Sequence, residues 1–292
     1  MISADRLLPL WLKYRDALEA PIQTFEFAKF NRRFEDRTYQ MGVLNLSSDS
    51  SYRETVCHTF EAALYRGRRM TLEGAAMVDI GAESTGETAD VVSTQKQIDR
   101  MRPVVRALAD ENILVSVETY HPEVGIALLE AGAGVINLTG RVDDQELYRA
   151  IAKHQAGVVL CYTPGENARS VDHLPPADEI FDQQLTFFKK RINLATEAGV
   201  ERLWVDPGFA IRPTAFCSLS VCGSLAGRSR FNCPAPCIYS AMKCALHKQV
   251  PRRSRFSPRR IWSAATRCRA CNRFLICRIL PDRNTVTRQH VR

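Results

Sequence analysis

The sequence lacks any long apolar segment. No stretch of about 20 apolar residues, the length that crosses a bilayer as a helix, occurs among its 292 residues. A secretory signal would need an uninterrupted apolar core near the N-terminus, but the first residues include the charged side chains Asp5, Arg6, Lys13, Arg15 and Asp16. We therefore expect a cytoplasmic protein without a membrane partner.

Two further shortages divide the chain near Ile211. Only Cys57 and Cys161 precede residue 212, whereas eight cysteines follow it. Acidic residues almost vanish at the same place, because residues 212–292 hold 17 Lys and Arg but a single acid, Asp282, while the remainder holds 23 basic and 31 acidic residues. The overall net charge of +8 thus averages two unlike pieces.

In the chain before residue 212, short β-branched or apolar runs alternate with longer amphipathic segments, which is typical of βα units. Strands are predicted at Tyr39–Leu46, Ala76–Ile80, Ile113–Val117, Gly134–Leu138, Gly157–Cys161 and Arg202–Val205. Six repeats favour an incomplete (βα)8 TIM-type barrel over residues 39–211. Residues 1–38 are predicted to form an amphipathic helix, Leu7–Leu18, and a connector.

Polar residues follow nearly every predicted strand. They are Asn45, Glu83, Ser84, Thr85, Glu118, Thr119, Tyr120, Asn137, Tyr162 and Asp206. Any one of them could simply start a turn or cap the next helix. In a barrel, however, the carboxyl ends of all strands converge on one face. Together they predict a ligand pocket with several convergent polar groups.

Five segments, in order, resemble the motifs of the dihydropteroate synthase family of pterin-binding barrels. They are Met41–Ser50, Gly74–Thr85, Ser116–Tyr120, Ala131–Asn137 and Val205–Phe209, so the resemblance covers residues 40 to 210. It implies a transferase of folate biosynthesis that joins a dihydropterin methyl diphosphate to p-aminobenzoate and releases pyrophosphate. A homodimer is compatible with this assignment.

The resemblance also implies roles for individual side chains. A pterin presents a 2-amino-4-oxo-pyrimidine edge, for which Asp206 would be a paired acceptor. Asn137, donor and acceptor at once, would suit the remaining mixed edge, and Glu118 would accept another hydrogen. The alternative is that Asp206 and Asn137 close turns and that Glu118 caps a helix.

A second group of residues is assigned to the diphosphate by the same resemblance. Asn45, with Mg2+ as the cofactor, would face the leaving group, whose developing charge needs cationic stabilisation. Ser84 and Thr85 would donate to the phosphates, and Arg53 would supply a positive charge. No catalytic residue is assigned.

The sequence also departs from the family pattern. Glu118 stands where the family has Asp, Gly86-Glu87 replaces Arg-Pro, Leu138 replaces Asp, and Cys161-Tyr162 replaces Met-His. No match is found after residue 210 for the Lys and the Arg-x-His of the family's last two strands, and a six-stranded arc leaves two open edges. An inactive or repurposed pterin- or folate-binding paralogue of methyltransferase type, or a truncated pseudoenzyme, is the alternative to a working synthase.

Residues 212–292 follow neither period 2 nor period 3.6 and are rich in Arg, Cys and Ser, as expected of a disordered segment or a gene read out of frame. A nucleic-acid-binding tail is disfavoured because aromatic residues are sparse. The cysteines Cys233, Cys237, Cys268 and Cys271 have irregular spacing for zinc. Translating the other two frames after the Gly208 codon tests the frameshift: an open frame that encodes Lys and Arg-x-His supports it, and two closed frames exclude it.

Overall fold

The computed structural model describes residues 12, 24–35, 39–47, 55–84, 89–170, 179–208, 238–239 and 273–276. The predicted helix Leu7–Leu18 and most of the segment 212–292 therefore lie outside the described residues. The strands are β1 (Phe25–Phe27), β2 (Arg32–Phe34), β3 (Tyr39–Asn45), β4 (Met77–Gly81), β5 (Val115–Thr119), β6 (Val135–Leu138), β7 (Gly157–Cys161), β8 (Arg202–Asp206), β9 (Ile238–Tyr239) and β10 (Arg273–Ile276). The helices are η1 (Ala28–Phe30), α3 (Phe60–Leu72), α4 (Thr94–Asp110), α5 (Pro122–Glu130), α6 (Gln145–Lys153) and α7 (Ile180–Glu197).

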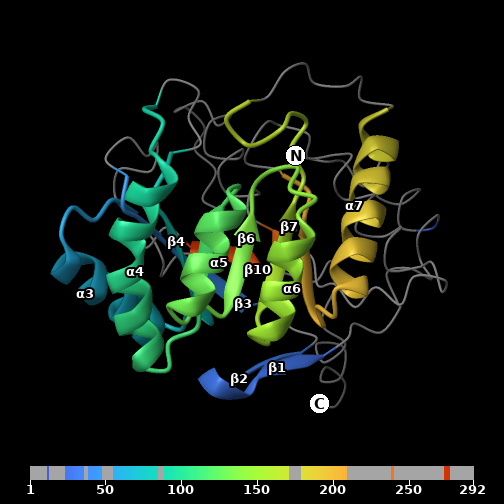
Figure 1. Ribbon diagram of the computed structural model, residues 1–292. Coiled ribbons are helices and arrows are strands. Elements are labelled where there is room, and N and C mark those ends of the chain that lie inside the picture. The colour runs from blue at the N-terminus through green and yellow to red at the C-terminus, as the bar shows by residue number, and fades with distance from the viewer. Residues whose placement is uncertain are drawn as a thin grey trace, which may run out of the picture.

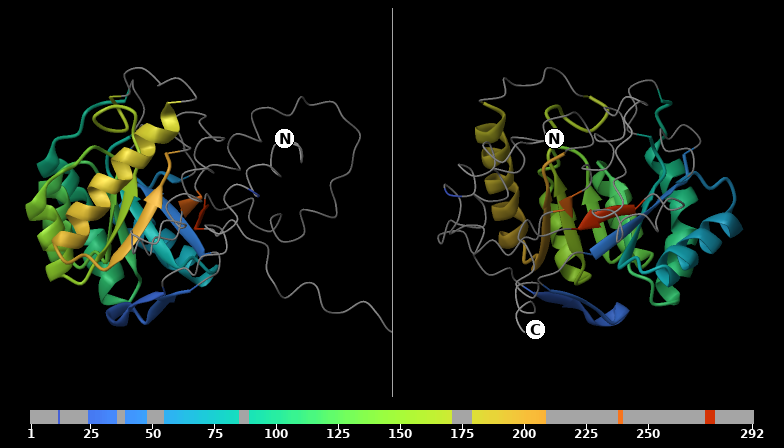
Figure 2. Two further views of the ribbon diagram at one scale, coloured as in Figure 1. Left: turned by 90° about the vertical axis from the view of Figure 1, so that its right-hand side faces the viewer. Right: turned by 180° about the vertical axis from the view of Figure 1, so that it is seen from behind.

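Six parallel strands, β3 to β8, lie in chain order in one curled sheet. Helices α3 to α7 cover its outer face (Figures 1 and 2). This arrangement confirms the prediction of an incomplete (βα)8 barrel with about six βα units. Among the described residues, no helix is both long and apolar enough to cross a membrane.

The outer edge of β3 carries two short strands that the sequence did not indicate. Strand β10 pairs antiparallel with β3, and β9 pairs antiparallel with β10. Both come from the segment predicted to be irregular. In a complete (βα)8 barrel every neighbour of the first strand runs parallel to it, so this pairing differs from regular closure.

The predicted strand bounds agree with the observed ones to within two residues, and β7 agrees at both ends. The differences have a common cause at the carboxyl ends, where Thr119 and Asp206 belong to strands although they are polar. The backbones of Thr119 and Asp206 continue the ladder, opposite Leu138 of β6 and Cys161 of β7, so their polar side chains do not end the strands. The expected connector before residue 39 proved wrong in part, because residues 25–34 form a hairpin.

This hairpin closes the amino end of the sheet. Trp204 of β8 is fully buried, and its ring centroid lies 4.7 Å from that of Phe25 and 5.2 Å from that of Phe34, both edge-on. Such aromatic pairs add about 0.5–1.5 kcal/mol each beyond area burial. Gly157 must lack a side chain here, since a Cβ atom would lie 2.8 Å from Trp204 and 3.0 Å from Phe27. Figure 1 shows the hairpin beneath the sheet.

Side chains of the parallel strands alternate between two cores, as a period of two requires. Outward residues such as Val78, Val117 and Leu160 pack against the helices. Inward residues at the amino ends pack on the hairpin, and they are Met41, Met77, Leu114, Val135, Val159 and Trp204. The apolar inner core thus covers the inner face of the sheet at the amino ends of the strands. The inner face at the carboxyl ends is not part of this core.

Candidate functional site

The inner face of the sheet changes from apolar to polar toward the carboxyl ends of the strands. Two residues beyond each apolar inward residue, the same columns carry Asp79, Ser116, Asn137, Cys161 and Asp206, and two residues further Glu118 follows Ser116. On β3 the polar residue is Asn45, which is level with Gly81 of β4. Strand register places Glu118 beside Asn137 and Cys161 beside Asp206. Four of the predicted residues therefore lie at or next to the carboxyl ends of β3, β5, β6 and β8 on this face, and they are Asn45, Glu118, Asn137 and Asp206.

Asp79, which sequence reasoning missed, lies at the centre of this polar layer. Its side chain is buried, and its two oxygens accept hydrogen bonds from the Ser116 hydroxyl at 2.5 Å and from Nδ2 of Asn137 at 3.1 Å. Burial raises the pKa of Asp79 to about 6, although the two donors lower it. The signal in the sequence was a carboxylate in the middle of the apolar run Met77–Gly81.

The Asn137 side chain is oriented by Asp79. Because an ionised carboxylate only accepts, the amide nitrogen of Asn137 faces Asp79 and the amide oxygen faces away. That oxygen, Oδ1, is buried and has no hydrogen-bond partner in the part of the chain that the structure describes, and the whole residue is only 8% exposed. A buried unpaired acceptor is costly. Asn137 thus offers a ligand an acceptor, while one of the two N–H groups of its amide donates to Asp79.

Asp206 is held at the end of β8 by its neighbours. Its Oδ1 accepts from the backbone N–H of Gly208 at 2.9 Å, and its carboxylate also pairs with the Cys161 thiol. Burial raises the pKa of Asp206 to about 6, and raises the pKa of the Cys161 thiol well above its usual value, so that the thiol stays protonated. The thiol donates to the carbonyl of Tyr162 at 3.8 Å. Asp206 as a whole residue is partly exposed.

Glu118 reaches across the end of β4. A Cβ atom built on Gly81 would lie 3.2 Å from Oε2 of Glu118 and 3.5 Å from Oδ1 of Asn45, so the longer side chain occupies the space that this glycine leaves open. Burial, followed by the negative charges of Asp79 and Asp206, raises the pKa of Glu118 to about 8. At neutral pH this group is mostly a protonated acid.

We expect Glu118→Gln to stabilise the folded chain at pH 8. The Glu118 carboxyl loses its proton near pH 4.5 when unfolded but only near pH 8 when folded. Wild-type stability therefore falls as pH rises through this window. Gln has no proton to lose. The free energy of unfolding of the variant should therefore exceed that of the wild type by about 2 kcal/mol at pH 8, and the difference should be least near pH 5. Urea unfolding at both pH values measures it, and an advantage independent of pH would contradict the assignment.

Other predicted residues lie elsewhere. Ser84 is buried just beyond β4, whereas Thr85 and Arg53 lie outside the described residues. Tyr162, one residue past the inward Cys161, points to the opposite side and packs against α7, where its ring centroid is 5.2 Å from that of Phe187. Its expected place at the pocket is therefore wrong, because a step of one residue along a strand changes the face.

No set of three or more His, Cys, Asp or Glu side chains in the described part of the chain is arranged to hold a metal ion. Asn45 donates through Nδ2 to Thr55 at 2.6 Å, which turns its amide oxygen toward Gly81 and Glu118. Mg2+ commonly takes only one or two protein oxygens and completes its shell with water and substrate phosphates. The amide oxygen of Asn45 fits the role of one such protein ligand.

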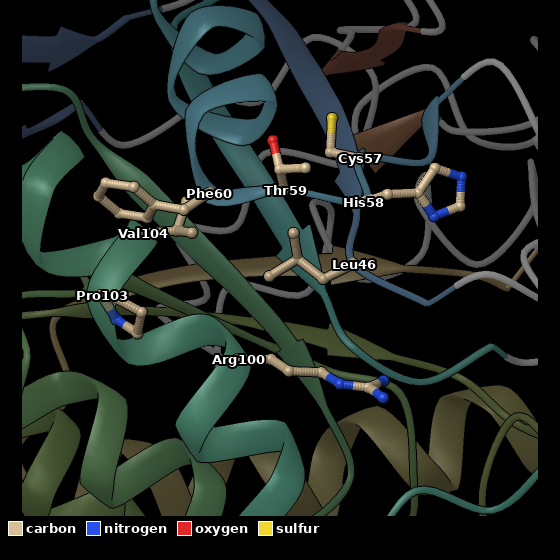
Figure 3. Close-up of a pocket in the computed structure, with 8 residues that line it drawn as sticks. All are labelled: Leu46, Cys57, His58, Thr59, Phe60, Arg100, Pro103 and Val104. Carbon is tan, nitrogen blue, oxygen red and sulfur yellow. The ribbon is translucent and has the colours of Figure 1, made fainter.

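A separate hollow of about 360 Å3 lies between the β3–α3 connection and α4. Figure 3 shows its lining, in which the imidazole of His58 and the guanidinium of Arg100 do not meet. Thr59 caps α3 there by accepting from the N–H of Ala62 at 3.1 Å. The convergent polar groups belong to the inner strand ends and not to this hollow.

Comparison with known proteins agrees with this geometry. The family described as pterin binding enzyme matches residues 41–273. The chain belongs to this family. The matched range runs past residue 210, where the recognisable motifs end, and so includes part of the basic segment.

The similar proteins are dihydropteroate synthases, which confirms the resemblance seen in the motifs. The enzyme of Synechocystis is 29% identical over 242 residues, covering 80% of this chain and 81% of that protein. A probable bifunctional folylpolyglutamate synthase/dihydropteroate synthase of Halobacterium salinarum is 35% identical over 182 residues, 62% of this chain but 22% of that protein.

Solved structures give the same family. The dihydropteroate synthase of Yersinia pestis, in complex with a sulfonamide drug, superposes with a TM-score of 0.55 and 31% identity over 64% of this chain and 68% of that one. The Xanthomonas albilineans enzyme with 4-aminobenzoic acid superposes with a TM-score of 0.51 and 34% sequence identity. This match covers 61% of this chain and 64% of that one. The match thus spans about two thirds of the solved enzymes.

Proposed function

We propose that this chain is a dihydropteroate-synthase-like protein that binds a dihydropterin methyl diphosphate at the inner strand ends. The observation that carries the proposal is the buried Oδ1 of Asn137, which has no hydrogen-bond partner among the described residues and can take a donor from a ligand. Asp206 and Glu118 stand on the two sides of this group in the curled sheet. An acceptor-rich pocket suits the amino and ring N–H groups of a pterin edge.

The pocket chemistry can be assigned atom by atom. The Asp206 carboxylate would accept from the 2-amino group and the adjacent ring N–H as a pair. Oδ1 of Asn137 would accept a further ligand hydrogen. Glu118, protonated at neutral pH, would donate one hydrogen bond and accept another. In this assignment the additional methylene of Glu118, compared with the family's Asp, is accommodated over Gly81.

The amine nitrogen of p-aminobenzoate would bond to the pterin methylene carbon and release one proton to water. The carbon–oxygen bond to the diphosphate would break, and its electron pair would leave with the pyrophosphate. Asn45 would hold Mg2+, which would supply charge for the departing diphosphate. Ser84, Thr85 and Arg53 would contribute donors on the same side.

A pterin-binding paralogue without synthase activity is the second candidate. One described residue favours it: Leu138, where the family has Asp, is buried at 1% exposure in the outer core and brings no polar group to the pocket. The domain limits belong to the same proposal, with residues 39–211 as the pterin-binding portion and 212–292 as a basic segment. The reading-frame test decides the origin of that segment.

Calorimetry with the dihydropterin methyl diphosphate, with and without Mg2+, tests binding by the full chain. We expect saturable binding of one ligand per pocket. A folded chain that binds none would overturn the proposal. Pyrophosphate release on adding p-aminobenzoate separates the two candidates, because a synthase releases it and a binding paralogue does not.

A further inference from the structure

Glu83 is a buried carboxylate that does not take part in the proposed pocket chemistry. It lies two residues beyond β4, and its side chain is 6% exposed. Its Oε1 accepts from the backbone N–H of Val92 at 2.9 Å, and its Oε2 accepts from Nε2 of Gln97 at 3.3 Å. Glu83 therefore ties the start of the β4–α4 loop to the end of that loop and to the helix that follows.

Two other loops bring polar groups to the same carboxylate. The Tyr120 hydroxyl, from the β5–α5 loop, hydrogen-bonds to Glu83, and burial together with this bond raises the pKa of Tyr120. Nε2 of His121 lies 3.8 Å from Oε2. From the β7–α7 loop, Nη1 of Arg169 lies 3.8 Å from Oε1. Three βα loops thus meet at one buried charge.

Arg169 donates three hydrogen bonds to backbone carbonyls. Nη1 donates to the carbonyl of Ser84 at 2.9 Å and of Asp90 at 3.2 Å, and Nη2 donates to the carbonyl of Ala89. The guanidinium therefore holds both flanks of the β4–α4 loop, and its side chain is only 12% exposed. A guanidinium offers five donors in a rigid fork, which suits such a bridging task. Three of its five donors thus contact carbonyls on the two flanks of this loop.

The loop that carries Arg169 is itself fixed to its neighbour. Oδ1 of Asn167 accepts from the backbone N–H of Arg169 at 2.9 Å, and Asn167 bridges to Gly140 of the β6–α6 loop. The N–H of Ala168 donates to the carbonyl of Thr139 at 2.9 Å. The described parts of the loops that follow β4, β5, β6 and β7 are consequently joined side by side. We call these parts, residues 82–84, 89–93, 120–121, 139–144 and 162–170, the loop belt.

We propose that Arg169 is a positioning residue of the strand-end site, which holds the loop belt in its binding shape before a ligand arrives. The belt follows directly on the strands that carry Asp79, Glu118, Asn137 and Cys161. Displacement of these loops would change the places of strand-end side chains that must be held to a fraction of an ångström. The part of the inference that concerns ligand affinity rests on the proposed pterin function, whereas the joining of the loops does not.

Hydrogen exchange on the full unliganded chain tests the clamp. For Arg169→Gln we expect amides at residues 89–92 and 166–170 to exchange at least about tenfold faster, while strand amides of β5 and β6 keep their protection. Arg169→Lys keeps the charge but cannot bridge three carbonyls, so it should fall between. The matched control is Arg68→Gln, which removes an exposed ion pair with Glu111 and should leave the belt unchanged.

Pterin affinity provides the second readout. We expect Arg169→Gln to weaken binding about tenfold and Arg68→Gln to leave it unchanged. Unchanged exchange in the belt overturns the clamp, and faster exchange with unchanged affinity overturns the positioning role. If Arg169→Gln does not fold, Arg169→Lys decides by the same two measurements. If the wild type binds no pterin but exchange responds as expected, the proposed function fails while the clamp stands.

Discussion

Replacing Asp206 with Asn is expected to weaken pterin binding by about 100-fold, which corresponds to about 3 kcal/mol. The carboxylate presents two acceptors, whereas the amide of Asn presents one acceptor and a donor that would face the ligand's own N–H groups. The fold should tolerate the change, since Oδ1 of the new amide can still accept from Gly208 at the end of β8. Burial raises the pKa of Asp206 to about 6, so removing its charge does not cost stability at neutral pH.

Calorimetric titration of a pterin at pH 7 measures this effect. Asp110→Asn is the control, because Asp110 is an exposed carboxylate at the end of α4 and the substitution makes the same chemical change. The control should bind as the wild type does. An affinity of Asp206→Asn within threefold of the wild type would show that the ligand does not use this carboxylate.

Asp79→Asn should reduce pterin affinity by about 10- to 100-fold without touching the ligand. If the Ser116 hydroxyl continues to donate to position 79, the new amide nitrogen faces the amide nitrogen of Asn137, and the Asn137 side chain then has to turn over. Its carbonyl oxygen then pairs with position 79, and its N–H group enters the pocket where an acceptor stood. The free energy of unfolding should stay the same or rise at pH 7, since the ionised Asp79 is costly to bury and has its pKa raised to about 6.

A double variant separates this orientation effect from general damage. In Asp79→Asn with Asn137→Asp, the amide at position 79 donates to one oxygen of the new carboxylate and leaves the other oxygen as an acceptor for the ligand. We expect it to recover at least part of the lost affinity. Ligand titration and urea unfolding on the wild type, both single variants and the double variant complete the cycle. A double variant that binds no better than either single variant would refute the orienting role of Asp79.

The sequence by itself determined the repeated βα units, the bounds of β7 and the polar residues at the strand ends. These features are local, because a strand is set by apolar periodicity and a strand end by the residues that follow it. The motifs around Asn45 and Asn137 also indicated the family, which comparison with known proteins confirmed. A local pattern does not show, however, to which face of the sheet a side chain at a strand end points. Tyr162 was therefore predicted at the pocket, although it packs on α7.

Only the tertiary structure decided the partners of the side chains. The pair Asp79 and Asn137 is separated by 58 residues and the contact of Arg169 with Ser84 by 85, so no local pattern links them. The hairpin packs on Trp204 in the same way, through contacts between distant parts of the chain. Hydrogen bonding and burial fix which atom of Asn137 faces a ligand, because a buried polar group must find its partner wherever the fold brings one.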